Sequence, residues 1–205
     1  MLRIYSIPVG IMKSNCYVAF DDRKAVIIDP GADGERIIKA IKNTYLTPEA
    51  ILLTHAHFDH FGAANEISEH FDIPVIVDVN DKHFLTDPDL NLSMSHLYTP
   101  VTFDGKVEVV HNQTLKLIGH NFSFIATPGH TPGSSCILVN DKLFTGDTLF
   151  KLSIGRAFAP YGNTEQIISS IKNKICIYEK DFICFPGHGE QTNLFYEMYH
   201  NPFLI

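Results

Sequence analysis

The sequence predicts an α/β fold in which two β-sheets pack together and helices cover their outer faces. Strand-like segments rich in Ile, Val, Tyr and Phe alternate with helical patterns through the first half of the chain. A second block of strand-like segments fills residues 106–144, and a helical pattern and a last apolar segment follow it. Two blocks of strands, each followed by helices, indicate two sheets with helices outside them.

The first half of the chain predicts a β-α-β-α-β order. Short segments of β-branched and aromatic residues bounded by turn residues predict strands, here at Leu2–Ile7, Cys16–Phe20, Lys24–Asp29, Ala50–Leu53 and Ile73–Val79. Apolar residues at helical spacing predict two helices, one through Ile37, Ile38, Ile41 and Tyr45 and one through Ala63, Ala64, Ile67 and Phe71.

The second half begins with a short helical segment at Asp81–Leu85 and a long polar stretch from Thr86 to Pro100. A loop of that length in a compact domain is usually functional or mobile, and it could border a cleft or be a plain surface excursion. Further strands are predicted at Lys106–Val110, Leu115–Ile118, Phe122–Thr127, Cys136–Val139 and Lys142–Phe144, then a helix at Thr164–Ile171 and a strand at Phe182–Phe185.

Composition predicts one soluble globular domain over residues 1–205. Of the 205 residues, 45% are apolar and 19% are charged, which excludes a disordered chain. The net charge is −7, and the basic residues form no stripe, which argues against nucleic acid as a partner. No apolar run approaches the roughly 18 residues that a membrane span needs, so we expect no membrane partner. The oligomeric state is not predicted.

Cysteine usage and the N-terminus favour a cytoplasmic protein. The four cysteines are irregularly spaced within apolar segments, which indicates buried free thiols rather than disulfides. The first residues show no basic region followed by an apolar stretch and a cleavage site, so no secretory signal is predicted.

Histidine is the one residue type in clear excess, with eleven copies. Five of them, together with two aspartates, follow the predicted ends of strands, where loops carry function on a rigid scaffold. These residues are His55, His57, Asp59, His60, His130, Asp147 and His188. The other six histidines match no motif and are predicted to lie on the surface or behind the ligands: His70, His83, His96, His111, His120 and His200.

The spacing of these side chains indicates two metal ions. His55 and His57 point the same way in an extended turn, and His130 would complete a three-imidazole site of the kind that a catalytic zinc prefers. Asp59, His60 and His188 can surround a neighbouring ion. Asp147 can offer one carboxylate oxygen to each ion, and two ions about 3.5–4 Å apart can activate a bridging water.

Four segments carry a family resemblance, and they occur in a fixed order along the chain: Thr54–His60, Gly129–Gly133, Gly146–Phe150 and Pro186–Gly189. They resemble the motifs of the metallo-β-lactamase superfamily, and most closely its glyoxalase II-like (hydroxyacylglutathione hydrolase-like) branch. The resemblance implies a four-layer αββα sandwich with the metals in a cleft at the edge of the sheets. It also implies that Asp29 supports the site without binding metal.

The resemblance implies a dinuclear metal-dependent hydrolase that cleaves thioesters through a hydroxide bridging the two ions, with Asp59 orienting that hydroxide. Zinc is the first expectation for the metal, and iron or manganese are alternatives. A mononuclear iron persulfide dioxygenase is the runner-up from another class. A lactonase or a nuclease of the same superfamily ranks lower.

Substrate contacts are expected from Arg156 and Tyr161. Relatives that cleave glutathione thioesters have a basic residue at the position of Arg156, although Ala157 and Phe158 depart from the pattern of related chains. A structural ion pair remains the alternative for Arg156, and plain packing the alternative for Tyr161. The chain also ends about where the classical enzymes add a helical domain that helps to hold glutathione, so no such domain is expected here.

Overall fold

The computed structural model describes residues 1–205 and contains two six-stranded mixed sheets. The first sheet has the order β1-β2-β3-β4-β5-β6. Its strands are β1 (Arg3–Val9), β2 (Ser14–Asp21), β3 (Lys24–Ile28), β4 (Thr47–Leu52), β5 (Val75–Asp78) and β6 (Val107–Val110). The second sheet has the order β14-β13-β10-β9-β8-β7. Its strands are β7 (Thr114–Leu117), β8 (His120–Ala126), β9 (Ser135–Val139), β10 (Lys142–Gly146), β13 (Ile183–Pro186) and β14 (Thr192–Asn193).

Helices and one short hairpin complete the fold. The hairpin pairs β11 (Leu149–Phe150) with β12 (Ser153–Ile154). The helices of the first half are α1 (Gly34–Asn43), α2 (Phe58–Phe61), α3 (Ala64–Phe71), the 3₁₀-helix η1 (Val79–Leu85) and α4 (Ser93–Leu97). The helices of the second half are α5 (Thr164–Ser170), the π-helical turn η2 (Ile171–Ile175) and α6 (Leu194–His200).

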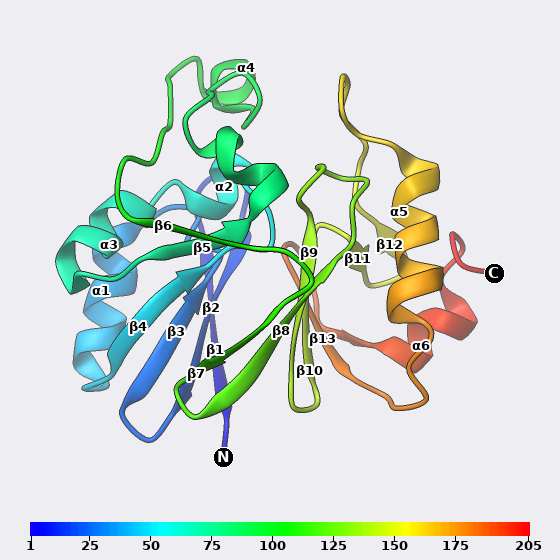
Figure 1. Cartoon of the computed structure of the whole chain (residues 1–205), viewed down its shortest axis with the longest axis horizontal. Coiled ribbons are helices and arrows are strands. Elements are labelled where there is room, and N and C mark those ends of the chain that lie inside the picture. The colour runs from blue at the N-terminus through cyan, green and yellow to red at the C-terminus, as the bar shows by residue number, and fades with distance from the viewer.

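The layers follow from which face of each strand is apolar. Strand β2 is buried on both faces: Tyr17 and Ala19 face the core between the sheets, whereas Cys16 and Val18 face the helices. Figure 1 shows α1 and α3 outside the first sheet on the left, and α5 and α6 outside the second sheet on the right. The fold is therefore the four-layer αββα sandwich that the sequence predicted.

Two segments of the chain differ from the sequence-based prediction. The stretch from Thr86 to Pro100 contains the short helix α4, and the C-terminal segment forms β14 and α6. Helix α6 buries the charged Glu197 together with Leu194. The Glu197 carboxylate accepts hydrogen bonds from Leu152 N at 2.8 Å and from Thr192 Oγ1 at 2.6 Å, and these bonds tie the helix to its neighbours.

The strand directions bring several loops to one end of the sandwich. Strands β8, β10 and β13 run in the same direction, so the loops that follow them leave the second sheet at the same edge. The loop after β4 reaches this edge from the first sheet, where Ser135 N donates a hydrogen bond to Thr54 O at 2.8 Å. Residues from both sheets can therefore meet at this end.

The absence of disulfides agrees with the sequence-based prediction. All of the cysteines are free, with Cys16, Cys136 and Cys184 buried and Cys176 partly buried. None of the helices combines the length and the apolar character that crossing a membrane requires.

The core between the sheets predicts a large effect of one substitution. Phe144 is fully buried and its ring lies 5.4 Å from that of Tyr17 and 5.1 Å from that of Phe185. Phe144→Ala leaves a cavity there, so we expect urea denaturation to show a loss of about 3–5 kcal/mol in the free energy of unfolding. The matched control is Phe203→Ala at a ring that is 41% exposed, for which we expect less than about 1 kcal/mol. Equal losses would contradict this account of the core.

Candidate metal centre

The seven histidines and aspartates selected from the sequence converge at the end of the sandwich where the loops meet. They form three overlapping sets, within each of which the ligand atoms lie within 4.8 Å of one another. The sets are His55, His57 and His130; His55, His60 and Asp147; and Asp59, His60 and His188.

The first set brings three imidazole nitrogens to one point. His130 Nε2 lies 3.2 Å from His55 Nε2 and 2.9 Å from His57 Nδ1. All three rings are buried. Burial lowers the pKa of His55 and His57 well below the usual value, and the neighbouring imidazoles lower it further. The rings are therefore neutral at pH 7, which is the form that binds metal.

The remaining nitrogen of His130 and of His55 is occupied by a polar partner. His130 Nδ1 lies 2.6 Å from the carbonyl oxygen of Arg156, which can only accept, so this nitrogen carries the proton. His55 Nδ1 lies 3.2 Å from Thr54 Oγ1, and that hydroxyl already donates to Asp29 Oδ2 at 2.7 Å. Nδ1 is again the donor, so the Nε2 atoms of both rings keep free lone pairs.

Tyr161 fixes the tautomer of His57 in the same way. The Tyr161 hydroxyl donates to Leu90 O at 2.7 Å and lies 2.9 Å from His57 Nε2. Since the hydroxyl proton is used by Leu90, His57 Nε2 is the donor and Nδ1 keeps its lone pair. The hydroxyl that we expected to contact substrate thus contacts a ligand histidine, and Tyr161 does not line the cleft described below.

Asp147 stands between the first set and the others. Its Oδ2 atom lies 3.6 Å from both His130 Nε2 and His188 Nε2, and its Oδ1 atom lies 3.5 Å from His60 Nε2. His188 Nε2 lies 3.1 Å from Asp59 Oδ2. One carboxylate is therefore within reach of donors from both proposed ions, as the spacing of the motifs predicted.

Nearby charges strongly shift the pKa values of His60 and Asp59. Burial alone would lower the pKa of His60, but Asp147, Asp29 and Asp59 outweigh it and raise that pKa to about 10. Burial opposes ionisation of Asp59, yet His60 and His188 hold its pKa below the usual range. An ion bound by His60 must displace its proton, so metal binding releases protons here.

Asp29, which the family resemblance implied to be a supporting residue, lies behind this group of donors. Its Oδ1 accepts a hydrogen bond from Thr54 N at 2.8 Å, and its Oδ2 lies 3.0 Å from His60 Nδ1. Gly187 makes room on the other side, because a Cβ atom there would overlap the Asp147 carboxylate and the His60 ring. Only glycine allows the chain to pass this close to the donors.

Unsatisfied polar atoms show that the arrangement fits a metal ion. His60 Nδ1, His60 Nε2 and Asp147 Oδ1 are buried and make no hydrogen bond, which is costly for buried polar groups. His60 Nδ1 still lies 3.0 Å from the Asp29 carboxylate, whereas His60 Nε2 and Asp147 Oδ1 face the donor sets. Three imidazole lone pairs also face one another in the first set. A cation is the group that would satisfy both features, and the mixture of imidazole and carboxylate donors suits zinc or iron.

The donors open into a cleft of about 320 Å³. Its wall includes the side chain of Arg156, which is exposed and forms no ion pair, so the structural ion pair considered above is not present. Leu92 and His96 also line the cleft, so the stretch from Thr86 to Pro100 does border it. The rest of the lining comprises Met12, Phe150, Phe158 and the proposed ligands His57, Asp59, His130, Asp147 and His188.

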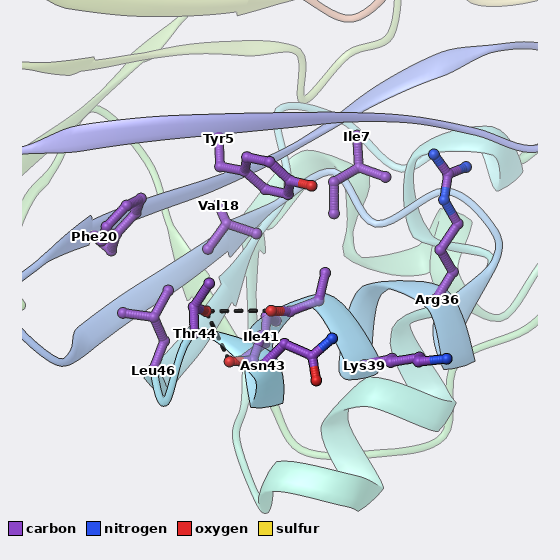
Figure 2. A pocket seen from close by; sticks show the side chains of 11 residues that line it. Tyr5, Ile7, Val18, Phe20, Arg36, Lys39, Ile41, Asn43, Thr44 and Leu46 are labelled. Carbon is purple, nitrogen blue, oxygen red and sulfur yellow. Dashed lines mark hydrogen bonds between the residues drawn. The ribbon is translucent and has the colours of Figure 1, made fainter.

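A second hollow of about 410 Å³ lies between α1 and strands β1 and β2 (Figure 2). Its floor is apolar, with Ile7, Val18 and Ile41, and Arg36 and Lys39 stand at its edge. Neither histidine nor cysteine nor a carboxylate lines it. It therefore offers no donor for a metal and no nucleophile, and it is not part of the centre.

The sequence-based prediction missed Asp81, a buried acidic residue beside the proposed metal ligands. Burial raises the pKa of this carboxyl to about 6, although hydrogen bonds from Thr131, Ala56 and Gly133 oppose that change. An isolated aspartate at the start of a short helix carries no motif, so no pattern could have singled it out. His96 was also placed outside the site, and only the position of α4 brings it to the cleft.

The three overlapping sets predict the metal stoichiometry. We expect the purified protein loaded with Zn²⁺ to hold two ions per chain by elemental analysis. His55→Ala removes a donor that two of the sets share, so at most one ion should remain after gel filtration. His70→Ala, at an exposed histidine of α3, is the matched control and should keep both. Retention of two ions by the His55 variant would contradict the assignment.

Comparison with known proteins identifies the family. The sequence profile of the metallo-beta-lactamase superfamily matches residues 9–188. Hydroxyacylglutathione hydrolase GloC of Haemophilus influenzae is 37% identical over 212 residues, which cover 99% of this chain and 98% of that protein.

Two solved structures share the fold along the whole chain. The BLEG-1 B3 metallo-beta-lactamase superposes with a TM-score of 0.94 at 41% identity, covering 98% of this chain and 99% of that one. TTHA1623, solved in a di-iron-bound form, gives a TM-score of 0.86 at 30% identity, covering 98% and 100%. With this fold, this family profile and a buried His/Asp cluster suited to metal ions, the chain belongs to the metallo-beta-lactamase superfamily and is a hydrolase of that superfamily.

Proposed function

We propose that this protein is a dinuclear zinc hydrolase that cleaves thioesters of the hydroxyacylglutathione kind. The observation that carries the proposal is Asp147, whose carboxylate lies within 3.6 Å of His130 and His188 and so connects two donor sets at the floor of one cleft. The similarity to GloC over nearly the full length of both chains supports the substrate class.

The donor sets indicate which residues would hold each of the two ions in this reaction. Two divalent ions held there would supply a water of lowered pKa as the nucleophile and would polarise the substrate carbonyl. His55, His57 and His130 would hold one ion, and Asp59, His60 and His188 the other, with Asp147 in reach of both. The side chain of Asp59 is 13% exposed, so it can also accept a hydrogen bond from the attacking water and orient it.

The lining of the cleft favours a substrate with both apolar and anionic parts. Met12, Leu92 and Phe150 provide apolar surface, and Arg156 provides an unpaired guanidinium. A guanidinium binds carboxylates through two parallel hydrogen bonds. A small thioester whose thiol portion carries a carboxylate, as glutathione does, matches this combination.

Metal content and hydrolysis of S-lactoylglutathione, measured on one sample, test the proposal. We expect about two zinc ions per chain together with turnover. Two zinc ions without turnover would keep the metal centre and overturn the substrate, and parallel assays with a lactone and with a β-lactam would then identify the replacement. The β-lactam arm follows from the likeness to BLEG-1. One iron per chain with oxygen consumption on a persulfide would instead support a dioxygenase.

Loss of a shared donor should abolish turnover. Asp147→Ala removes the carboxylate that connects the two sets and would help to hold both ions. Because those ions would activate the water and polarise the substrate carbonyl, we expect kcat to fall by about 100-fold or more. The measurement is kcat on S-lactoylglutathione at saturating Zn²⁺. His111→Ala, at a histidine outside the centre, should keep normal turnover. An active Asp147 variant with full metal content would contradict the mechanism.

Arg156 should govern affinity for anionic substrates. A hydrogen bond to a charged group contributes about 1.5–3 kcal/mol, so we expect Arg156→Ala to raise KM for S-lactoylglutathione about tenfold or more while kcat stays near normal. Arg156→Lys should recover part of the loss. A neutral thioester serves as the control substrate, and its KM should not change. An equal rise in KM for both substrates would show that Arg156 maintains the structure of the cleft and does not bind the substrate's carboxylate.

A further inference from the structure

Asp81 is a fully buried carboxylate that the proposed reaction does not use. It lies in η1 with an exposed fraction of 0%, and it forms no ion pair with a basic side chain. Burying an ionisable group without a counter-ion is unfavourable unless hydrogen bonds compensate. Hydrogen bonds from neighbouring segments must therefore stabilise the Asp81 carboxylate.

The carboxylate joins two loops that come from different sheets. Its Oδ2 atom accepts hydrogen bonds from Ala56 N at 3.0 Å and from Thr131 Oγ1 at 2.7 Å. Its Oδ1 atom accepts a hydrogen bond from Gly133 N at 2.6 Å. Ala56 belongs to the loop that follows β4, whereas Thr131 and Gly133 belong to the loop that follows β8.

Each contacted segment carries a proposed metal ligand. Ala56 lies between His55 and His57 in the chain, and Thr131 directly follows His130. The three imidazole nitrogens must stay about 3 Å apart, although they come from two loops. A carboxylate that bonds to both loops fixes that separation.

The close approach of the second loop depends on glycine. A Cβ atom at position 133 would lie 2.6 Å from the Asp81 Cγ, N and Oδ1 atoms, closer than real contacts allow. Glycine therefore lets the backbone amide reach the carboxylate. The fold thus admits this contact only through the pairing of Asp81 with Gly133.

We propose that Asp81 is a positioning residue that holds the His55–His57 loop and the His130 loop at the separation required by one metal ion. This inference rests on the metal centre in the proposed function, but it does not depend on which substrate is cleaved. Residues that hydrogen-bond to metal ligands commonly raise metal affinity about 10–100-fold. Asp81 does not bond to a ligand side chain itself, but to the backbone and one side chain of residues next to the ligands.

Asp78 provides a matched control from the adjoining strand end. Its side chain is also buried, with an exposed fraction of 1%. It accepts hydrogen bonds from Asn80 N and Nδ2, both at 2.9 Å, and pairs with His111 at 2.8 Å, but it bonds to neither ligand loop. A general effect of removing a buried carboxylate should appear equally in both variants.

The test is competition for Zn²⁺ between the full-length protein and a chromophoric chelator. Asp81→Asn keeps the volume of the side chain, but its NH₂ group opposes at least one of the N–H or O–H donors that face it. We expect the dissociation constant of one of the two ions to rise about 10–100-fold, with the other ion less affected. Asp78→Asn should leave both constants unchanged. The absorption spectrum of the Co²⁺-loaded protein should change for Asp81→Asn and not for Asp78→Asn.

A milder variant keeps the inference testable if Asp81→Asn does not fold. Thr131→Val removes one of the three hydrogen bonds and keeps the β-branched shape, so we expect a smaller rise in the same dissociation constant. Far-UV circular dichroism and urea denaturation of the metal-free proteins check folding in each case. Unchanged Zn²⁺ affinity in a folded Asp81→Asn or Thr131→Val protein would overturn the inference. Equal weakening by Asp81→Asn and Asp78→Asn would overturn it as well.

These outcomes are separate from those of the proposed function. A wild-type protein that binds two zinc ions but cleaves no thioester would remove the proposed substrate and leave the Zn²⁺ titrations of Asp81 and Asp78 variants fully interpretable. A wild-type protein that binds no metal through His55, His57 and His130 would overturn both proposals.

Discussion

Nitrogens of three neutral imidazole rings face one another at the end of the sandwich where the loops meet, and hydrogen bonds from the surrounding residues hold the rings there. His130 Nε2 is within 3.2 Å of a nitrogen of His55 and of His57. Lone pairs at that separation repel unless a cation lies among them. The hydrogen bonds of Thr54, Tyr161 and the Arg156 carbonyl prevent the rings from turning away, because each of them occupies the opposite nitrogen. Hydrogen bonds within the chain itself thus point three imidazole lone pairs at one position.

Holding the rings in place requires contacts between the two sheets. The hydrogen bond from Ser135 N to Thr54 O and the bonds of Asp81 to both ligand loops connect the first sheet to the second at the end of the sandwich. Farther from that end, Tyr17, Phe144 and Phe185 pack between the sheets. The apolar core supplies stability, and the polar contacts at the edge supply the geometry of the site.

The cleft brings a basic side chain and several apolar side chains together from segments that are distant in the sequence. The protein carries a net charge of −7, yet the guanidinium of Arg156 stands unpaired at the cleft beside apolar side chains. A local positive charge in an acidic protein attracts anionic groups. Leu92 and His96 line the same cleft, so the segment from Thr86 to Pro100 contributes to its shape.

Local patterns in the sequence were sufficient to predict two packed sheets with helices outside them and to single out the residues that converge at the site. Strand alternation and helical spacing are short-range signals, and the string from His55 to His60 places several metal-ligating side chain types within one turn. The four-layer αββα order itself was implied by the resemblance of the motifs to a family, and not by these patterns. Helix α6 escaped prediction because its buried Glu197 is held partly by a contact distant in the sequence, the hydrogen bond from Leu152 N.

Only the tertiary structure decided which partners each polar side chain has. The Tyr161 hydroxyl, which the sequence led us to expect at the substrate, lies 2.9 Å from His57 Nε2 and donates to Leu90 O. Asp81 became a link between two loops because β4 and β8, which are far apart in the chain, end beside it. A residue type limits which bonds a side chain can make, but the packing of the sheets determines which partners lie within reach.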